Sequence, residues 1–359
     1  MIKVEPKLLD SESKQKKIAV DLSKNDRFYT MIKDYHFNYI RIFLGKRNKL
    51  HTEIIARTKN SREMKEIQAG LKIIQAIGLE KASLTTHINL ATHIADQQYS
   101  PHFKYALSIE QRLLIPDKVD ILLDFFDKEL GKQCDIYSFL KILCLESLTI
   151  GKIKGKVYDS IKNDFIKVYG FQEIFLLNNL EKLKILKKKE TNTFYEFIQT
   201  KMRLINDSVN TIEPDDTAYV FGGFCPLSIR LVEKVIQDGW GSIKDIMTKI
   251  PGITEYPNDE NEILRSYNDK NIILLVYVGG ITYAEIAAIR YLNNRPGTKY
   301  KFIIMTTSII SPKSFIDELR FKRDPIPENE EDQKEEDPEQ MKGPLSFRSF
   351  YSQLKKIIK

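Results

Sequence analysis

The sequence predicts a mixed fold, in which a largely α-helical domain is followed by a partial α/β domain with a parallel sheet. Two observations predict it. Apolar residues recur at helical spacing through most of residues 21–206. Two later segments, AYVFGGF and IILLVYVGG, each run from apolar residues into a Gly-Gly pair and then into helix-forming sequence, an order typical of consecutive strand-helix units in an α/β layer.

Composition and patterning divide the chain into five segments. Residues 1–20 are polar and are expected to be frayed. The helical domain is expected over 21–213 and the α/β domain over 214–321. Residues 322–344 are acidic and contain several prolines, which predicts disorder, and 345–359 form a candidate terminal helix.

The first helices are predicted to form a protruding hairpin over 61–98. Apolar residues step by three and four from Met64 onward. Gly78 then occupies the place of a glycine that ends a helix, and Ser83 is placed to cap a second helix, so the tip is expected at 77–82. The apolar stripes of such helices are expected to be buried in the protein's own core, and the alternative is a groove for a partner.

Further helices are predicted over 118–130, 136–147 and 154–169. After Gly170, the segment FQEIFLLNNLEKLKIL predicts either two short helices or a helix and a turn.

The α/β domain is predicted to contain strands over 218–221, 272–278 and 302–306, with helices that begin near Leu227 and Ile281. Three parallel strands alone would leave a sheet edge exposed, so another element is expected to cover it.

Charge and cysteine content exclude several classes of protein. The 56 basic and 49 acidic residues are interleaved, and the densest basic run, EKLKILKKK, lacks aromatic residues for base stacking, so no nucleic-acid partner is expected. The three widely spaced cysteines predict neither disulfides nor a zinc site and suit a reducing, cytosolic setting. No apolar run approaches the length of roughly 18 to 20 residues that would span a bilayer.

Neither Gly-Gly pair satisfies a phosphate-binding template. Gly279 and Gly280 are followed by ITYAEIA, which has neither a third glycine nor a Lys-Ser/Thr pair. The earlier pair is followed by FCPLSIR, in which Pro226 supplies no N–H. Both pairs are therefore interpreted as tight corners between elements. The alternative hypothesis is an α/β enzyme that binds a nucleotide at Gly279 and Gly280.

No catalytic, metal or cofactor site is predicted. Glu285 is expected in the first turn of a helix, where the helix dipole stabilises a carboxylate. This explains the residue better than a role in acid-base catalysis does. Cys225 lacks the setting of a catalytic nucleophile and is interpreted as a small core residue. The histidines lack the spacing of metal ligands.

Several segments resemble one protein family. YVFGGFCPLSIRLVE, GWGSIKDIMTKIPG, VYVGGITYAEIAAIRYL and KFIIMTTSIISPKSFIDEL, in this order, are similar to the C-terminal part of the vacuolar protein sorting-associated protein thirty-three branch of the SM (Sec/Munc) family. YGFQEIFLLNNLEKLKIL and DFFDKELGKQCDIYSFLKILCLESL resemble the same branch. The resemblance extends from about Leu22 to about Leu319.

This resemblance implies a function without catalysis. Members of the family are chaperones that bind SNARE helices, and this branch works in the HOPS and CORVET tethering complexes. The resemblance implies a cytoplasmic protein, peripheral on endosome and vacuole or lysosome membranes, that acts in vesicle docking and membrane fusion. It assigns 21–213 to domain three and 214–321 to the second half of domain two. Nothing in the sequence corresponds to the family's domain one or to the first strands of domain two.

The family's use of the hairpin region implies a SNARE-binding site there. Ile77, Leu79 and Leu84, near the predicted tip, are expected to be the residues least needed for the core. The full set of expected SNARE contacts is Ile67, Leu71, Ile74, Ile77, Leu79, Leu84 and Ile88.

A second site is implied for the helical solenoid subunit called vacuolar protein sorting sixteen, at Lys162, Phe171 and Ile174. Gly170 can end the preceding helix, and a helix would display Phe171 and Ile174 side by side. That arrangement predicts an apolar anchor beside a basic rim at Lys162. The alternative is that both apolar residues fill the core.

Overall fold

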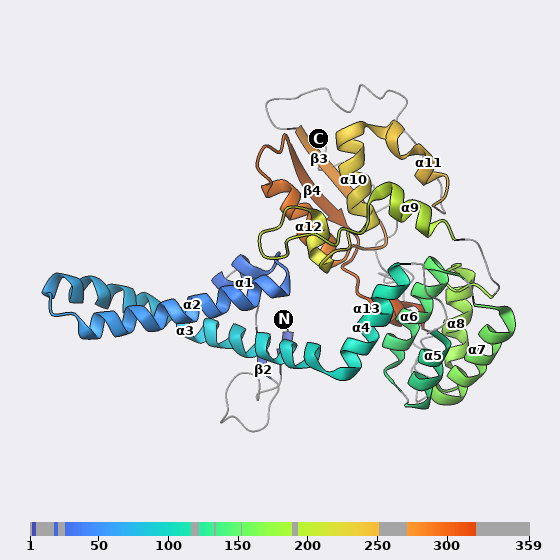
Figure 1. Ribbon diagram of the computed structural model, residues 1–359, viewed down its shortest axis with the longest axis horizontal. Coiled ribbons are helices and arrows are strands. Elements are labelled where there is room, and N and C mark those ends of the chain that lie inside the picture. Colours follow the sequence, from blue (N-terminus) through green and yellow to red (C-terminus); the bar gives the residue numbers. More distant parts are fainter. Residues whose placement is uncertain are drawn as a thin grey trace, which may run out of the picture. The chain divides into compact units, whose positions relative to one another are not determined.

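The computed structural model (Figure 1) describes the following residues: 2–4, 18–20, 26–115, 122–132, 134–151, 153–188, 193–250 and 271–320. The acidic segment expected at 322–344 and the helix expected at 345–359 lie outside the described residues.

The N-terminal segment contains a short antiparallel pair, which corrects the expectation that it is frayed. β1 (Ile2–Val4) pairs with β2 (Ile18–Val20), with Ile2 opposite Val20. Isoleucine and valine in both strands favour extended backbone.

Two long helices form a hairpin, but its turn is not at the predicted place. α2 (Phe37–Asn60) packs along α3 (Met64–Tyr99), and three residues, 61–63, connect them (Figure 1). α3 continues through Gly78, so the predicted break and the predicted tip at 77–82 are wrong. The apolar period stays in phase across Gly78, and one glycine costs a helix interior only about 1 kcal/mol relative to alanine.

Polar contacts attach the base of the hairpin to α1 (Arg27–Ile32). Asp26 accepts hydrogen bonds from the N–H of Tyr29 at 2.9 Å and from the Ser83 hydroxyl at 3.0 Å, and lies 3.0 Å from His87 Nε2. Ser83 therefore attaches α3 to α1 and does not cap a helix, which corrects its predicted role.

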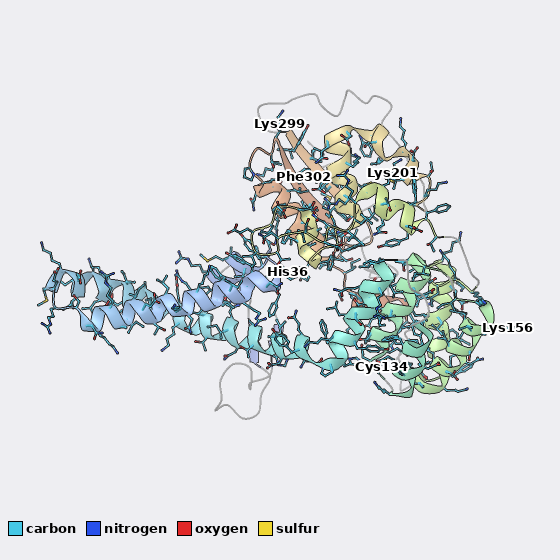
Figure 2. All side chains as sticks on the ribbon, viewed as in Figure 1. His36, Cys134, Lys156, Lys201, Lys299 and Phe302 are labelled. Atoms are coloured by element: carbon cyan, nitrogen blue, oxygen red, sulfur yellow. The ribbon has the colours of Figure 1, made fainter. Side chains whose placement is uncertain are left out.

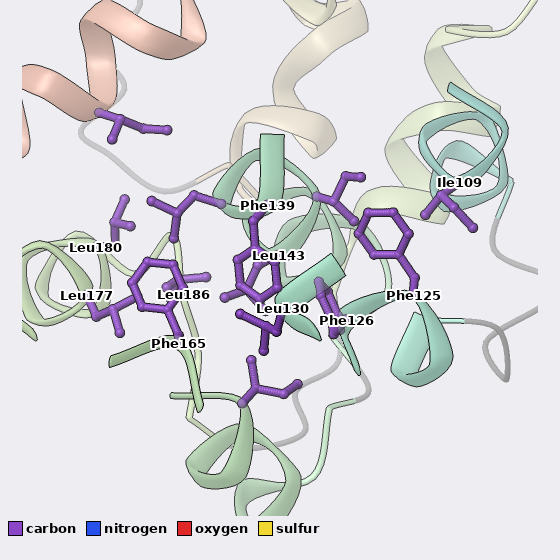
Figure 3. Packing of buried hydrophobic residues seen from close by; sticks show 14 of the residues in the cluster. Ile109, Phe125, Phe126, Leu130, Phe139, Leu143, Phe165, Leu177, Leu180 and Leu186 are labelled. Carbon is purple, nitrogen blue, oxygen red and sulfur yellow. The ribbon is translucent and has the colours of Figure 1, made fainter. Parts of the chain in front are cut away.

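The main helical core comes from the next five helices. They are α4 (Pro101–Leu114), α5 (Leu122–Gly131), α6 (Ile136–Thr149), α7 (Gly155–Tyr169) and α8 (Glu173–Lys182). Figure 3 shows the packing at the centre of this core, which includes Phe126, Phe139, Phe165, Leu177 and Leu180. All five of these side chains are nearly or completely buried.

The last described helix, α13 (Pro312–Leu319), contacts α6 and α8. Ile316 is buried in the helical core, Tyr137 donates to Asp317 at 2.6 Å, and Arg320 forms an ion pair with Glu173 at 3.0 Å. α13, which the sequence groups with the α/β segment, therefore packs on the helical core and does not cover the sheet.

The strand expected at 218–221 is wrong, because these residues form a 3-10 helix, η2 (Thr217–Phe221). Asp216 accepts the N–H of Ala218 at 2.7 Å, and Gly222, with φ of 63°, ends the helix. A short apolar run between turn residues does not by itself distinguish a strand from a helical turn.

Three shorter elements connect the helical core to the sheet. They are α9 (Tyr195–Met202), η3 (Trp240–Ile243) and α11 (Lys244–Met247). Ile198 of α9 and Ile246 of α11 share a small apolar cluster.

The other two predicted strands are confirmed. β3 (Asn271–Tyr277) and β4 (Tyr300–Thr306) pair in parallel and are joined through α12 (Tyr283–Asn294). One face of the sheet packs against α10 (Leu227–Asp238) and α12. The other face presents exposed apolar side chains: Ile272, Leu274, Val276 and Ile303.

Candidate partner-binding surfaces

The side of α3 that faces away from α2 presents two large apolar side chains to solvent. Leu71 is 52% exposed and Leu79 is 87% exposed. Eight residues separate them, slightly more than two helical turns, so both lie on one side of the helix. Apolar anchors at this kind of spacing are what one helix presents to another. We call Leu71 and Leu79 the outer face of α3.

The other side of α3 is the hydrophobic seam of the hairpin. Ile77 and Leu84 are buried, and Leu84 packs with Phe28 and Leu44. The expectation that Ile77 and Leu84 are dispensable for the core is therefore wrong, and it followed from placing the turn at 77–82. The remaining expected contacts are partly buried: Ile67, Ile74 and Ile88.

A second apolar surface lies at the corner between α7 and α8. Gly170 ends α7 with φ of 104°, and its N–H donates to the carbonyl of Ile166 at 2.9 Å. Phe171 follows and is 71% exposed. Ile174, in the first turn of α8, is partly buried, whereas Phe175 is largely exposed. Sequence reasoning missed Phe175, although its spacing of four from Phe171 was a usable signal.

Lys162 does not form the free basic rim that was expected beside Phe171. Its amine donates to Asn178 at 3.1 Å and to Glu181 at 3.0 Å, so it holds α7 against α8. Burial works to raise the pKa of Glu181, but hydrogen bonds from Lys188, Lys162 and Tyr158 outweigh it and lower that pKa below its ordinary value. Lys162 is therefore already engaged in an ion pair within the protein, with a carboxylate that also binds Lys188.

An open hollow of about 570 Å³ lies beside this corner. It is lined by Phe175, Asn178, Asn179, Glu181 and Lys182, so it continues the exposed surface of Phe175 along α8. The hollow gives the corner between α7 and α8 a shape that could receive a projecting side chain.

The Gly279 and Gly280 corner offers few free donors to a phosphate. The N–H of Gly279 donates to the Thr307 hydroxyl at 3.0 Å, and the N–H of Ile281 donates to the carbonyl of Ser308 at 3.1 Å. A Cβ on Gly280 would lie 2.4 Å from a side-chain carbon of Ile310. Glycine is required here because the corner packs closely, which supports the interpretation as a structural corner.

Glu285 completes a capping box. Its carboxylate accepts the N–H of Thr282 at 2.9 Å, and its own N–H donates to the Thr282 hydroxyl at 3.3 Å. The interpretation of Glu285 as a helix-terminus residue is confirmed. Cys225 is buried, as expected for a core residue, and burial raises the pKa of its thiol to about 12.

A polar hollow of about 800 Å³ lies beside α9 and α10. Arg230, in its lining, is held by Asp216 at 2.6 Å and by Glu233 at 2.8 Å, so its charge is already paired. Among the described residues there is no group of three or more side chains that could hold a metal ion. None of the described helices has the length and apolarity to cross a membrane.

Comparisons with known proteins agree with this architecture. Curated relatives include the vacuolar protein-sorting-associated protein 33 homolog of Arabidopsis thaliana, which is 28% identical over 88% of this chain, and vacuolar protein sorting-associated protein 33A of Rattus norvegicus, which is 29% identical over 84%. These alignments cover 55% and 52% of the two relatives, so the chain spans about half their length.

A solved structure shares the fold. It is the SM protein Vps45 in complex with the Qa SNARE Tlg2, with a TM-score of 0.54 at 13% identity, covering 87% of this chain and 52% of the other. The sequence profile of the Sec1 family matches residues 2–318, nearly the whole described part of the chain. The chain therefore belongs to the Sec1 family of SM proteins.

Proposed function

We propose that this protein binds SNARE helices and acts in vesicle docking and membrane fusion, without catalysis. The observation that carries the proposal is the outer face of α3, where Leu71 and Leu79 are exposed on a helix whose opposite side buries Ile77 and Leu84. Because a continuous helix holds both side chains in a fixed register, it can align with another helix along its length.

The relatives support the same class of partner. The structure of similar fold is an SM protein bound to a Qa SNARE, and the curated relatives are vacuolar protein sorting proteins. From this we infer a protein that works at endosome and vacuole or lysosome membranes. SNARE contact is assigned to the outer face of α3, with Ile67 and Ile74 at its edge.

We propose further that the corner between α7 and α8 docks a helical solenoid subunit of a HOPS or CORVET type of tether. Phe171 is a projecting apolar anchor, and Phe175 extends it along α8. Ile174 is the partly buried support, and Lys162 holds the two helices in the geometry that presents the anchor. Central apolar anchors of this type contribute most of the affinity at many interfaces.

The SNARE proposal is tested with Leu71→Asp and Leu79→Asp. Each change places a charge where a partner helix would bury an apolar side chain, so binding of a purified Qa SNARE helical region should weaken about ten-fold or more for each variant. Isothermal titration of the full chain measures the affinity.

The control is Thr52→Asp, which adds the same charge at an exposed position of α2 and should leave the affinity unchanged. Circular dichroism melting shows whether each variant is folded. If a folded Leu79→Asp variant bound the SNARE region with the affinity of the parent, the outer face of α3 would not be part of the binding site.

A further inference from the structure

The turn of the hairpin carries an unusual concentration of positive charge. Residues 46–72 contain eight basic and three acidic residues, a net charge of +5 in a chain whose total is +7. This concentration is inconspicuous in the sequence, because the basic residues are spread over the end of α2 and the start of α3. The pairing of α2 with α3 brings five of them to the end where α2 meets α3, namely Arg57, Lys59, Arg62, Lys65 and Lys72, whereas the other three lie farther along α2.

Most of this charge has no counter-ion. Arg47 pairs with Glu80 at 2.8 Å, and Lys49 lies 3.8 Å from Glu53. The other six basic side chains are exposed, and none of them has an ion pair with the residues that the structure describes: Lys46, Arg57, Lys59, Arg62, Lys65 and Lys72. We call the five of these residues that lie near the turn, together with Met64, the basic turn: Arg57, Lys59, Arg62, Lys65 and Lys72.

Favourable interactions with the helix dipoles explain the positions of only some of these basic residues. Arg57 and Lys59 lie in the last turn of α2, where cations favour the helix dipole. Arg62 and Lys65 flank the first residues of α3, where the same dipole disfavours cations. Glu66 is the acidic residue in the first turn of α3, and it accepts a hydrogen bond from Ser61 at 2.8 Å. Glu63, the N-cap residue of α3, and Glu66 offset the unfavourable charge of Arg62 and Lys65, so these two exposed cations are not needed for the stability of α3 and are available to an anionic partner outside the helix.

Met64 adds an apolar component at the same place. It is the first residue of α3 and is 69% exposed, between Arg62 and Lys65. Two helices that meet at a three-residue connection form a convex end, which offers no groove for a partner helix. A flexible apolar side chain near the cations of a convex end fits the headgroup layer of a lipid bilayer, although Glu63 and Glu66 lie beside it as well.

We propose that the basic turn binds an anionic membrane surface, with lipid phosphates on its lysines and arginines and Met64 in the headgroup layer. Each basic residue near such a surface strengthens binding by about five-fold, so five of them suffice for reversible attachment. The contact uses side chains other than Leu71 and Leu79, so the two proposals can be tested with different variants, although Met64 and Lys72 lie on the same side of α3 as these leucines.

The test uses the full chain in co-sedimentation with vesicles of phosphatidylcholine alone and of phosphatidylcholine mixed with phosphatidylserine. Binding is expected only with phosphatidylserine and should weaken as salt is raised. The double variant Arg62→Gln with Lys65→Gln should bind about 30-fold more weakly. Met64→Ser should bind a few-fold more weakly at every salt concentration.

The matched control is Lys299→Gln with Lys301→Gln, which removes the same charge from an exposed site far along the sequence and should bind as the parent does. The proposal would be overturned if the protein bound both vesicle types equally. It would also be overturned if the Arg62 and Lys65 variant and the Lys299 and Lys301 variant lost vesicle binding to the same extent. If the Arg62 and Lys65 variant kept vesicle binding but lost SNARE binding, the basic turn would be a site for an acidic protein instead. Leu79→Asp should retain vesicle binding, so this test and the SNARE test can fail separately.

Discussion

The large apolar side chain of Phe171 is exposed to water in the folded chain. At 71% exposure, most of the ring is in water, although a Phe side chain that becomes fully buried contributes about 1.5 to 3 kcal/mol. The left-handed backbone of Gly170 directs the chain outward at this residue. One residue with unusual φ therefore determines that Phe171 projects while Leu176 and Leu177, one turn later, are buried.

Phe171→Asp should abolish binding of the helical solenoid subunit and change the free energy of unfolding by less than about 0.5 kcal/mol, because the ring is exposed. Urea unfolding and pull-down with the purified subunit measure the two quantities. Asn163→Asp, which adds a charge at an exposed position of α7, is the control and should bind normally. A stability loss of about 3 kcal/mol or more would instead place Phe171 in the core.

Among the elements, α3 departs most from the expected structure. It is 36 residues long and contains two internal glycines with different roles. A Cβ on Gly78 would have no heavy atom within 4 Å, whereas a Cβ on Gly70 would lie 2.2 Å from the hydroxyl oxygen of Thr58 on α2. Gly70 allows the two helices to approach closely, and Gly78 has no packing role.

Gly78→Ala should therefore stabilise the protein by about 0.5 to 1 kcal/mol, and Gly70→Ala should destabilise it by about 1 to 3 kcal/mol. Urea unfolding followed by circular dichroism measures both changes. The result for Gly78 also distinguishes the two interpretations of this segment. A glycine that ended a helix in the left-handed conformation would make the alanine variant less stable than the parent.

The type of most elements was predictable, whereas the positions of turns and the direction of side chains were less so. The predicted helices at 136–147 and 154–169 are confirmed, because each has a regular apolar period, and the strands at 272–278 and 302–306 are confirmed as short continuous apolar runs. Gly78 was misinterpreted because a glycine at the end of an apolar period resembles a helix terminus whether or not the next helix continues it. The pairing of α2 with α3 brings the residues of the basic turn together. This is a tertiary contact, which a local sequence pattern does not reveal.

At the scale of the whole molecule, the described residues pack against one side of the sheet only. Leu275 of β3 contacts the core shared with α10 and α12, while its neighbour Leu274 is exposed on the opposite face. The alternation along a strand thus divides this sheet into a face that stabilises the fold and an exposed apolar face, which we expect to promote self-association.

Leu274→Thr should leave the free energy of unfolding within about 0.5 kcal/mol of the parent and reduce self-association. Leu275→Thr, the matched change on the other face, should destabilise by about 2 kcal/mol. Thermal melting gives the stabilities, and light scattering after size-exclusion chromatography gives the mass in solution. The reverse order of stabilities would mean that the wrong face of the sheet has been assigned to the core.

The unbroken length of α3 makes the hairpin a lever arm. At 1.5 Å per residue, its 36 residues measure about 54 Å from the turn to Tyr99. A single non-helical residue, Ser100, separates α3 from Pro101 at the start of α4. A rotation of 10° at Ser100 would move the far end by about 9 Å, more than one and a half helical turns. Small torsional changes at one backbone position are thereby amplified into displacements as large as the width of a helix.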